Sequence, residues 1–136
     1  MVGWDAPREA GNPSLGAHQH RGMFEICYIV SGRVEWWVRR RSRARGPDVF
    51  VVEPGHVFLT RPNEEHGGVD SMLHPCELYW IQVRLGPGDR KVMTRLRQGS
   101  RTFQGGEAIR AAFERIVSEH AHRDRWSANA AGAALR

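Results

Sequence analysis

The stretch His18-Gln19-His20-Arg21-Gly22-Met23-Phe24-Glu25-Ile26-Cys27-Tyr28-Ile29-Val30-Ser31-Gly32 combines two histidines, a carboxylate and a glycine with an apolar run. Alternate side chains of an extended strand face the same way, so His18 and His20 would project together, ~7 Å apart. Glu25 lies in an apolar, β-prone run, where a carboxylate is costly unless it is paired or coordinated. With His66 farther along the chain, these residues are candidate ligands for a divalent metal such as zinc, nickel, iron or manganese.

Short apolar runs broken by turn residues continue from Phe24 to Leu85, which predicts a mainly β sandwich or barrel. Turns are expected at Gly32 and Pro54-Gly55, a break at Gly67-Gly68, and a strand end at Gly86-Pro87-Gly88. The expected strands are 24–31, 33–40, 48–53, 57–61, 76–85 and a short one at 101–103.

Beyond residue 100 the apolar period changes to that of a helix. Ile109, Ala112, Phe113, Ile116 and Val117 recur at offsets of 3, 4, 7 and 8, which predicts a helix over 107–120. The segment 126–136 is rich in alanine and helix-prone. The apolar stripe must pack on the barrel, on a second copy of the chain, or on both.

Length and composition indicate one soluble domain, because 136 residues with 40% hydrophobic content leave room for a single core. Five arginines lie in 39–45, and the other 15 basic residues balance the 15 acidic ones, so no DNA-binding face is expected. Cys27 and Cys76 are expected to be reduced core thiols. The polar segment 1–16 carries neither a signal peptide nor a membrane span, which favours a cytoplasmic protein without membrane contact.

The pattern His18-x-His20-x4-Glu25-x6-Gly32 resembles the first motif of the cupin superfamily, although Asn12 stands where the motif has an earlier glycine. The second cupin motif is present with its spacing intact, and its first glycine and its histidine are Gly55 and His66. Three of its other positions are substituted, by Arg61, Asn63 and Asp70. The resemblance implies a single-domain jelly-roll barrel with one or two C-terminal α-helices. It also implies that His18, His20, Glu25 and His66 converge on one metal.

The residues around these motifs are similar to the N-terminal sensing domain of AraC-type transcription regulators. The similarity extends over 26–32, over 54–68 and over Pro75-Cys76-Glu77-Leu78-Tyr79-Trp80-Ile81. In that family a cupin barrel precedes helices that pair two subunits and then a DNA-binding domain. The resemblance implies a flexible arm at 1–16, a barrel at 17–104, and dimerisation or linker helices at 105–136, cut before a DNA-binding domain. Ile109, Phe113 and Ile116 would form the dimer interface.

The expected function is effector sensing, with a sugar or small organic acid bound in the barrel by Arg61, Trp80 and Gln82. No catalytic residue is assigned, and DNA would be bound only through a domain outside this chain. A stand-alone metal-dependent oxygenase or isomerase is the alternative. The four ligand positions could equally form a metal-free hydrogen-bonded cluster, and Trp80 could simply fill the core.

Overall fold

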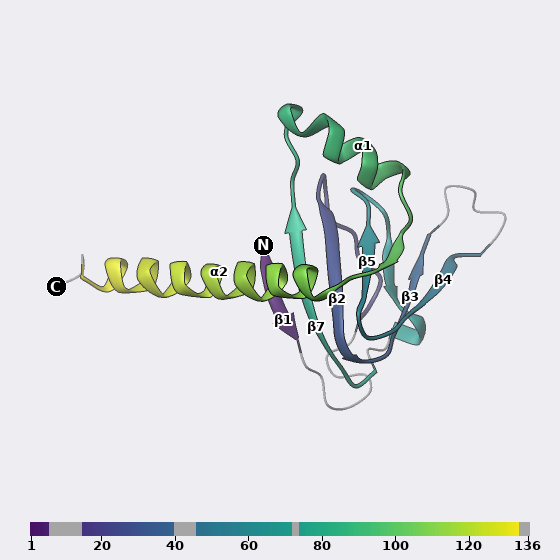
Figure 1. Cartoon of the computed structure of the whole chain (residues 1–136), viewed down its shortest axis with the longest axis horizontal. Coiled ribbons are helices and arrows are strands. Elements are labelled where there is room, and N and C mark those ends of the chain that lie inside the picture. The colour runs from purple at the N-terminus through teal and green to yellow at the C-terminus, as the bar shows by residue number, and fades with distance from the viewer. Residues whose placement is uncertain (6–14, 40–45, 72–73, 134–136) are drawn as a thin grey trace.

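The computed structural model describes residues 1–5, 15–39, 46–71 and 74–133, with side chains at 1, 15–39, 46–70 and 74–122. Helices α1 (Arg90–Gln98) and α2 (Glu107–Ala133) follow the main strands, and short 3₁₀ turns occupy Val69–Ser71 and Pro87–Asp89 (Figure 1). The strands are β1 (Val2–Asp5), β2 (Phe24–Gly32), β3 (Val34–Val38), β4 (Asp48–Val52), β5 (His56–Thr60), β6 (His66–Gly68), β7 (Cys76–Val83) and β8 (Thr102–Gln104).

The strands form two sheets whose recorded pairings are all antiparallel. One sheet has the order β1-β7-β2-β5-β8, and the other has the order β4-β3-β6. Strand β2 lies at the centre of the larger sheet, with β7 on one side and β5 on the other. The mainly β class expected from the sequence is confirmed, with two α-helices after the main strands.

Side chains from the inward faces of the strands fill the interior between the two sheets. Cys27 and Ile29 of β2 belong to this core, together with the inward face of β3. The Trp36 ring stacks on the Phe58 ring at a centroid distance of 4.6 Å and an angle of 14°. Of the two neighbouring tryptophans, Trp36 is therefore the core residue, whereas the Trp37 indole N–H donates to the Gly68 carbonyl at 3.0 Å.

The opposite face of the larger sheet carries helix α2. Tyr28 and Val57 form a second apolar cluster with Phe113, against which Ile26, Val30, Tyr79, Ile81 and Ile109 pack. The rings of Tyr28 and Phe113 lie 5.8 Å apart. Because β2 is covered on both faces, its sequence is a continuous apolar run rather than an alternating one. Figure 1 shows α2 crossing β2, β7 and β1 and extending beyond the sheet.

Two glycine turns set the strand connections next to β2. Gly32 and Gly55 both have positive φ, at 77° and 80°, a conformation that L side chains rarely adopt. A Cβ on Gly32 would lie 2.2 Å from the Pro75 carbonyl oxygen, whereas a Cβ on Gly55 would meet open space. The turn at Gly32 therefore needs glycine both for its backbone conformation and for lack of space, whereas the turn at Gly55 needs it for conformation alone.

The expected break at Gly67-Gly68 is wrong, because both residues lie in β6 and pair with β3. The glycines serve close packing here. A Cβ on Gly67 would lie 3.0 Å from the Gly16 carbonyl oxygen and 3.1 Å from the Trp37 ring. Two adjacent residues without side chains let the chain near Gly16 pass directly over this part of the sheet.

Three other expectations differ from the structure. Within the segment 1–16, expected to be a flexible arm, Val2–Asp5 form β1 and pair with β7. Helix α1 was not expected, although Val92, Met93 and Leu96 recur at helical offsets within it; the helix is short and its residues are mostly exposed. The two helical segments expected at 107–120 and 126–136 are joined in the single helix α2, which is described as far as Ala133.

Replacing Gly32 by alanine should destabilise the barrel much more than replacing Gly55. The Gly55→Ala change adds only left-handed strain, about 1–2 kcal/mol, because the new methyl group has room. The Gly32→Ala change adds the same strain and a clash with main-chain atoms, so it should cost at least about 2 kcal/mol more. Urea unfolding of the two variants measures the difference, and equal losses would contradict the role given to the Pro75 contact.

Candidate metal centre

The loops that carry the two sequence motifs are joined through their main chains. The His18 amide donates to the His66 carbonyl and the His66 amide to the His18 carbonyl, each at 2.9 Å. The Asn63 amide donates to the His20 carbonyl at 3.0 Å, and the Asn63 side-chain oxygen accepts from the Gly22 amide at 3.1 Å. Asn63 has φ 64°, so it takes the left-handed conformation that its position in the motif predicts. These bonds bring three histidines together.

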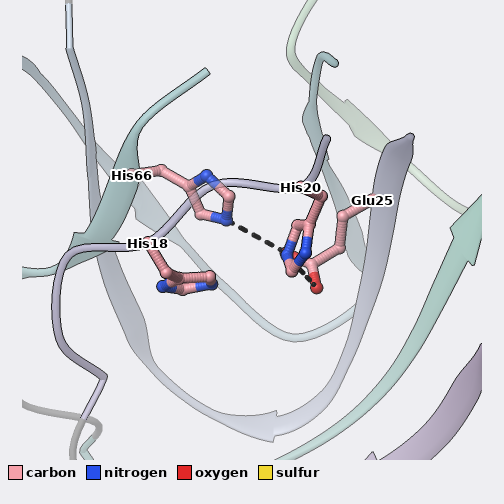
Figure 2. A group of neighbouring side chains, drawn as sticks. All are labelled: His18, His20, Glu25 and His66. Atoms are coloured by element: carbon pink, nitrogen blue, oxygen red, sulfur yellow. Dashed lines mark hydrogen bonds and ion pairs between the residues drawn. The ribbon is translucent and has the colours of Figure 1, made fainter. Parts of the chain in front are cut away.

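The three imidazole rings converge on the Glu25 carboxylate from β2 (Figure 2). Ring centroids lie 4.3 Å apart for His18 and His66, 5.1 Å for His18 and His20, and 5.3 Å for His20 and His66. His66 is 1% exposed. The convergence implied by the cupin resemblance is therefore present in this chain.

Main-chain carbonyls fix the outer nitrogen of two of the rings. Nδ1 of His18 lies 2.8 Å from the Gly16 carbonyl oxygen, and Nδ1 of His66 lies 2.9 Å from the Glu64 carbonyl oxygen. Each Nδ1 must carry its hydrogen to donate to a carbonyl. With an ion bound, a neutral ring held in this way would present its Nε2 lone pair to the metal, the arrangement that outer hydrogen bonds create in many metal sites.

Glu25 is held by three side chains. Its carboxylate lies 3.1 Å from Nε2 of His20 and 3.3 Å from Nε2 of His66, and it accepts a hydrogen bond from the Gln82 amide at 3.0 Å. Burial raises the pKa of the Glu25 carboxyl, but the hydrogen bonds to His20, His66 and Gln82 outweigh burial and hold this pKa well below its ordinary value. Glu25 is therefore an ionised carboxylate inside the barrel.

The spacing of these atoms suits a divalent ion. Two ligands of one ion, each bonded at ~2.1 Å, are ~3.0–3.4 Å apart when adjacent and ~4.2 Å apart when opposite. The contacts of Glu25 with His20 and His66, at 3.1 and 3.3 Å, have the spacing of adjacent ligands. One donor atom from each of the four residues lies within 4.8 Å of the others, so small inward movements would complete the site. The four residues fit a metal that prefers nitrogen and oxygen ligands.

A buried hydroxyl points to a further occupant near the cluster. Thr60 lies directly opposite Glu25 in the β2–β5 register, so the two side chains share the interior face. Thr60 is 2% exposed, and its hydroxyl has no hydrogen-bond partner among the residues that the structure describes. A buried hydroxyl left without a partner costs about 1–3 kcal/mol. A solvent or ligand molecule bound beside Glu25 would supply that partner.

A small cavity of about 150 Å³ opens beside the cluster. Its polar side consists of three cluster residues and Gln82, whose amide also lies 3.3 Å from Nε2 of His20. Its apolar side is lined by Leu15, Cys27, Trp36, Leu78 and Trp80. Trp80 therefore faces the interior while Tyr79 faces α2, and the strand parity brings two of the three expected effector residues, Trp80 and Gln82, to the cavity.

Arg61, the third expected effector residue, lies elsewhere, so its expected position facing the barrel cavity is wrong. Its guanidinium donates to the carbonyls of Leu96 and Gly99, at 3.3 and 2.9 Å, at the end of α1. Arg61 lines a second, larger hollow of about 920 Å³ that is mostly polar. The reason is the main-chain turn, which directs Arg61 away from the histidines while His66 points inward. No sequence signal distinguished these two directions.

The residues expected at a dimer interface are divided by the structure. Phe113 is buried against Tyr28, and Ile109 packs in the same cluster on the outer face of the barrel. Ile116 is 41% exposed. Of the arginine-rich segment, Arg39 is described and pairs with Glu65, and residues 40–45 lie outside the described part of the chain.

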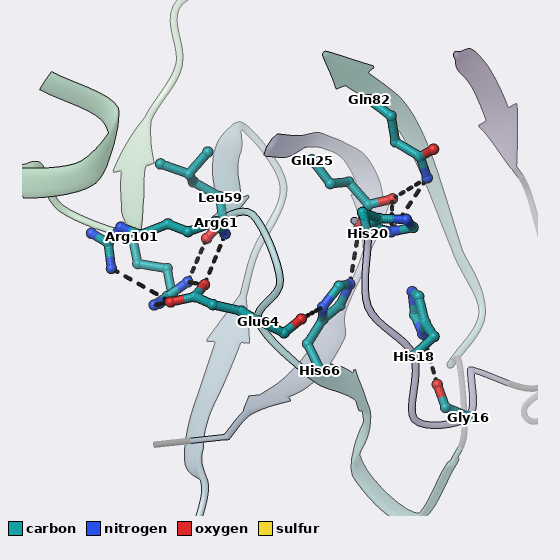
Figure 3. Close-up of polar contacts among 10 residues, drawn as sticks. All are labelled: Gly16, His18, His20, Glu25, Leu59, Arg61, Glu64, His66, Gln82 and Arg101. Carbon is teal, nitrogen blue, oxygen red and sulfur yellow. Dashed lines mark hydrogen bonds and ion pairs between the residues drawn. The ribbon is translucent and has the colours of Figure 1, made fainter. Parts of the chain in front are cut away.

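The sequence interpretation missed Glu64, whose main-chain oxygen orients His66 and whose carboxylate pairs with Arg101 at 2.7 and 2.9 Å (Figure 3). Glu64 lies two residues before the candidate ligand His66, and this proximity is the one sequence signal that could have indicated its role. Arg101 gave no signal, because it is distant in sequence and meets Glu64 only after folding.

Comparison with known proteins identifies a family. A family profile described as "AraC-like ligand binding domain" matches residues 7–135. No curated protein matches the chain in sequence.

Solved structures with some likeness include oxalate decarboxylase from Bacillus subtilis at pH 4.6, with a TM-score of 0.41 and 14% identity over 68% of this chain and 21% of that one. A mutant of the enzyme gives 0.40 and 14% over 65% and 20%. A structure from a study of its Mn(II) centres gives 0.39 and 14% over 68% and 31%. The chain thus spans a fifth to a third of the length of these structures.

Among the described residues, neither helix is long and apolar enough to cross a membrane.

A His66→Asn substitution should weaken binding of a divalent ion by at least about 100-fold, because it removes a direct ligand from the cluster. The matched control is His122→Asn, since His122 is an exposed histidine on α2. Isothermal titration with zinc and manganese, after metal stripping, measures both affinities. Equal affinities in the two variants would show that the ion binds elsewhere.

The metal-free chain should lose stability through Glu25 as the pH falls. The unfolded carboxyl titrates near its ordinary pKa of 4.5 and the folded one far lower. Below about pH 4.5 the unfolded state therefore takes up the proton first, and the free energy of unfolding falls by up to about 1.4 kcal/mol per pH unit. Denaturation with a chelator between pH 6 and 3.5 should show a weaker pH dependence in Glu25→Gln. The same slope in both proteins would contradict the ionised state.

Proposed function

Because the chain belongs to the AraC-like ligand binding domain family, as its motifs predict, we propose that it senses a small molecule bound in the cavity beside its His/Glu cluster. Family membership confirms the cupin barrel expected from the sequence and supports a ligand-sensing role. The class of ligand, the bound metal and the pairing with a second subunit are our proposals.

The cavity that joins the cluster to an apolar wall carries this proposal. Its volume of about 150 Å³ is below the range of about 300–1,000 Å³ typical of drug-sized ligands, so the effector is small. Trp80 and Leu78 offer apolar contact, while Gln82 and the histidines offer hydrogen bonds. A small organic acid or a sugar has the matching combination of a carbon skeleton and several oxygen atoms.

The same cluster would hold a divalent ion through His18, His20, Glu25 and His66. The ion would supply positive charge and open coordination positions for oxygen atoms of the effector, since four protein ligands leave two positions on an octahedral ion. Gln82 would orient Glu25 and contact the ligand. Zinc, nickel, iron and manganese all accept this ligand set.

Helix α2 would provide the contact with a second copy of the chain. Phe113 and Ile109 fix its first turns to the barrel, and Ile116 leaves an apolar side chain 41% exposed on the next turn. Two such helices would bury this surface across a two-fold axis. In a cytoplasmic regulator, effector binding would then bias the orientation of an attached DNA-binding domain.

A metal-dependent enzyme is the second candidate, favoured by the three histidines and one carboxylate. The rest of the cavity lining argues for a sensor instead. Among the described residues that line it, the groups outside the cluster are Leu15, Cys27, Trp36, Leu78, Trp80 and Gln82, and none is a carboxylate or an imidazole. A reaction would therefore depend on the ion, its ligands or the Cys27 thiol for every proton transfer.

Replacing Trp80 by alanine should reduce effector affinity by about 10-fold or more, because it removes one of the two tryptophan surfaces of the cavity. Trp37→Ala is the matched control, since Trp37 lies on β3 with its indole bonded to Gly68 outside this cavity. Thermal-shift screening of the metal-loaded chain with small organic acids and sugars identifies the ligand, and titration measures both variants.

An effector that binds both variants equally would place its site outside the cavity. Turnover of a screened compound by the loaded chain, in place of simple binding, would favour the enzyme.

A further inference from the structure

We propose that Glu64 and Arg101 are positioning residues that connect the His/Glu cluster to the segment entering α2, so that an ion at His66 stiffens residues 99–106. The inference rests on the proposed function, because it concerns how the same site would be read by the rest of the chain. Figure 3 shows Glu64 between His66 of the cluster and Arg101, in contact with both.

The connection begins at the ligand ring. Nδ1 of His66 donates to the main-chain oxygen of Glu64 at 2.9 Å, so the direction of the Nε2 lone pair depends on where Glu64 lies. Outer hydrogen bonds of this kind set the orientation and basicity of a ligating histidine. The His66 main chain is tied to His18, the Asn63 main chain to His20, and the Glu64 amide to the Arg61 carbonyl at 3.1 Å. The loop therefore has little freedom, and a shift of Glu64 would be passed to His66.

The side chain of Glu64 is fixed from the opposite direction. Arg101 donates two parallel hydrogen bonds to its carboxylate, at 2.7 and 2.9 Å, and the Arg61 amide donates a third at 2.8 Å. Arg101 is 13% exposed and Glu64 is 24% exposed, so solvent screens this pair less than a surface ion pair. A bidentate arginine–carboxylate pair is also more directional than a lysine contact.

Arg101 in turn fixes the start of β8. Its side chain donates to the Leu59 carbonyl at 2.8 Å, and its own carbonyl accepts from the Leu59 amide at 2.8 Å. Strand β8 has only three residues, all paired with β5 at the edge of the sheet. The Arg101 contacts therefore extend a short edge pairing by one residue on the side facing Glu64.

The segment after β8 leads directly into α2. The Gly105 amide donates to the Gly55 carbonyl at 2.8 Å, and α2 begins at Glu107. Arg61, from the same loop as Glu64, holds the end of α1 through the carbonyls of Leu96 and Gly99. The cluster, the end of α1 and the start of β8 thus meet at one loop, and β8 leads from there along β5 to the start of α2.

Coupling of this kind is reciprocal. If an ion at His66 orders the segment 99–106 through Glu64 and Arg101, then loosening Arg101 must weaken binding of the ion by the same factor. An ion pair that only stabilises the fold would lower the melting temperature when broken but leave metal affinity unchanged. Metal affinity and local exchange therefore separate the two roles.

The experiment uses zinc alone as probe and compares the unmodified chain with Arg101→Met, Arg101→Lys and Arg97→Met. Arg97 is the matched control, because it is an exposed arginine on α1 that lines the same large hollow. Titration should show about 10-fold weaker zinc binding in Arg101→Met, partial recovery in Arg101→Lys, and a change below about 2-fold in Arg97→Met. Hydrogen exchange should slow in 99–106 on zinc binding in the unmodified chain and in Arg97→Met only.

Unchanged zinc affinity in Arg101→Met, or zinc-dependent protection of 99–106 that persists in it, would overturn the inference while leaving the proposed metal site intact. An unmodified chain that binds no zinc would instead remove the proposed site, and the inference with it. If Arg101→Met does not fold, Glu64→Gln serves in its place. It keeps the main-chain oxygen that meets His66 and weakens only the pairing with Arg101.

Discussion

A buried carboxylate is the constraint on which the rest of this structure depends. Glu25 lies on the interior face of β2, where an ionised group is unfavourable unless donors surround it. The donors are His20 from the loop before β2, His66 from the start of β6, and Gln82 from β7. The loops must therefore close over the barrel, and their main chains are bonded to each other where they do so.

Strand β2 places this site close to the helix that would report on it. Its inward side chains include Glu25 and Cys27, and its outward side chains include Tyr28, which packs on Phe113 of α2. A shift of β2 would displace side chains on both faces of the sheet, because both faces are closely packed. The proposed connection from His66 through Glu64 and Arg101 to β8 differs, because it consists of polar contacts at the edge of the sheet rather than packing in the core.

Local sequence predicted side-chain direction well in strands, where each side chain lies on one of only two faces. The period of two in β7 placed Tyr79 and Trp80 on opposite faces, and only the position of α2 decided that Trp80 is the interior one. The apolar period of α2 was equally clear, although the sequence left its partner open. Helix α1 was missed because its helical period rests on only three apolar residues, Val92, Met93 and Leu96, in a short helix.

The sequence by itself determined the mainly β class, the turn at Gly32 and the four residues of the cluster, because strand period, glycine conformation and ligand chemistry are local properties. Tertiary structure alone decided that Arg61 points to α1, that Glu64 meets Arg101, and that Gly67-Gly68 is a strand rather than a break. These outcomes depend on contacts between segments far apart in the chain, and such contacts leave no periodic signal in either segment.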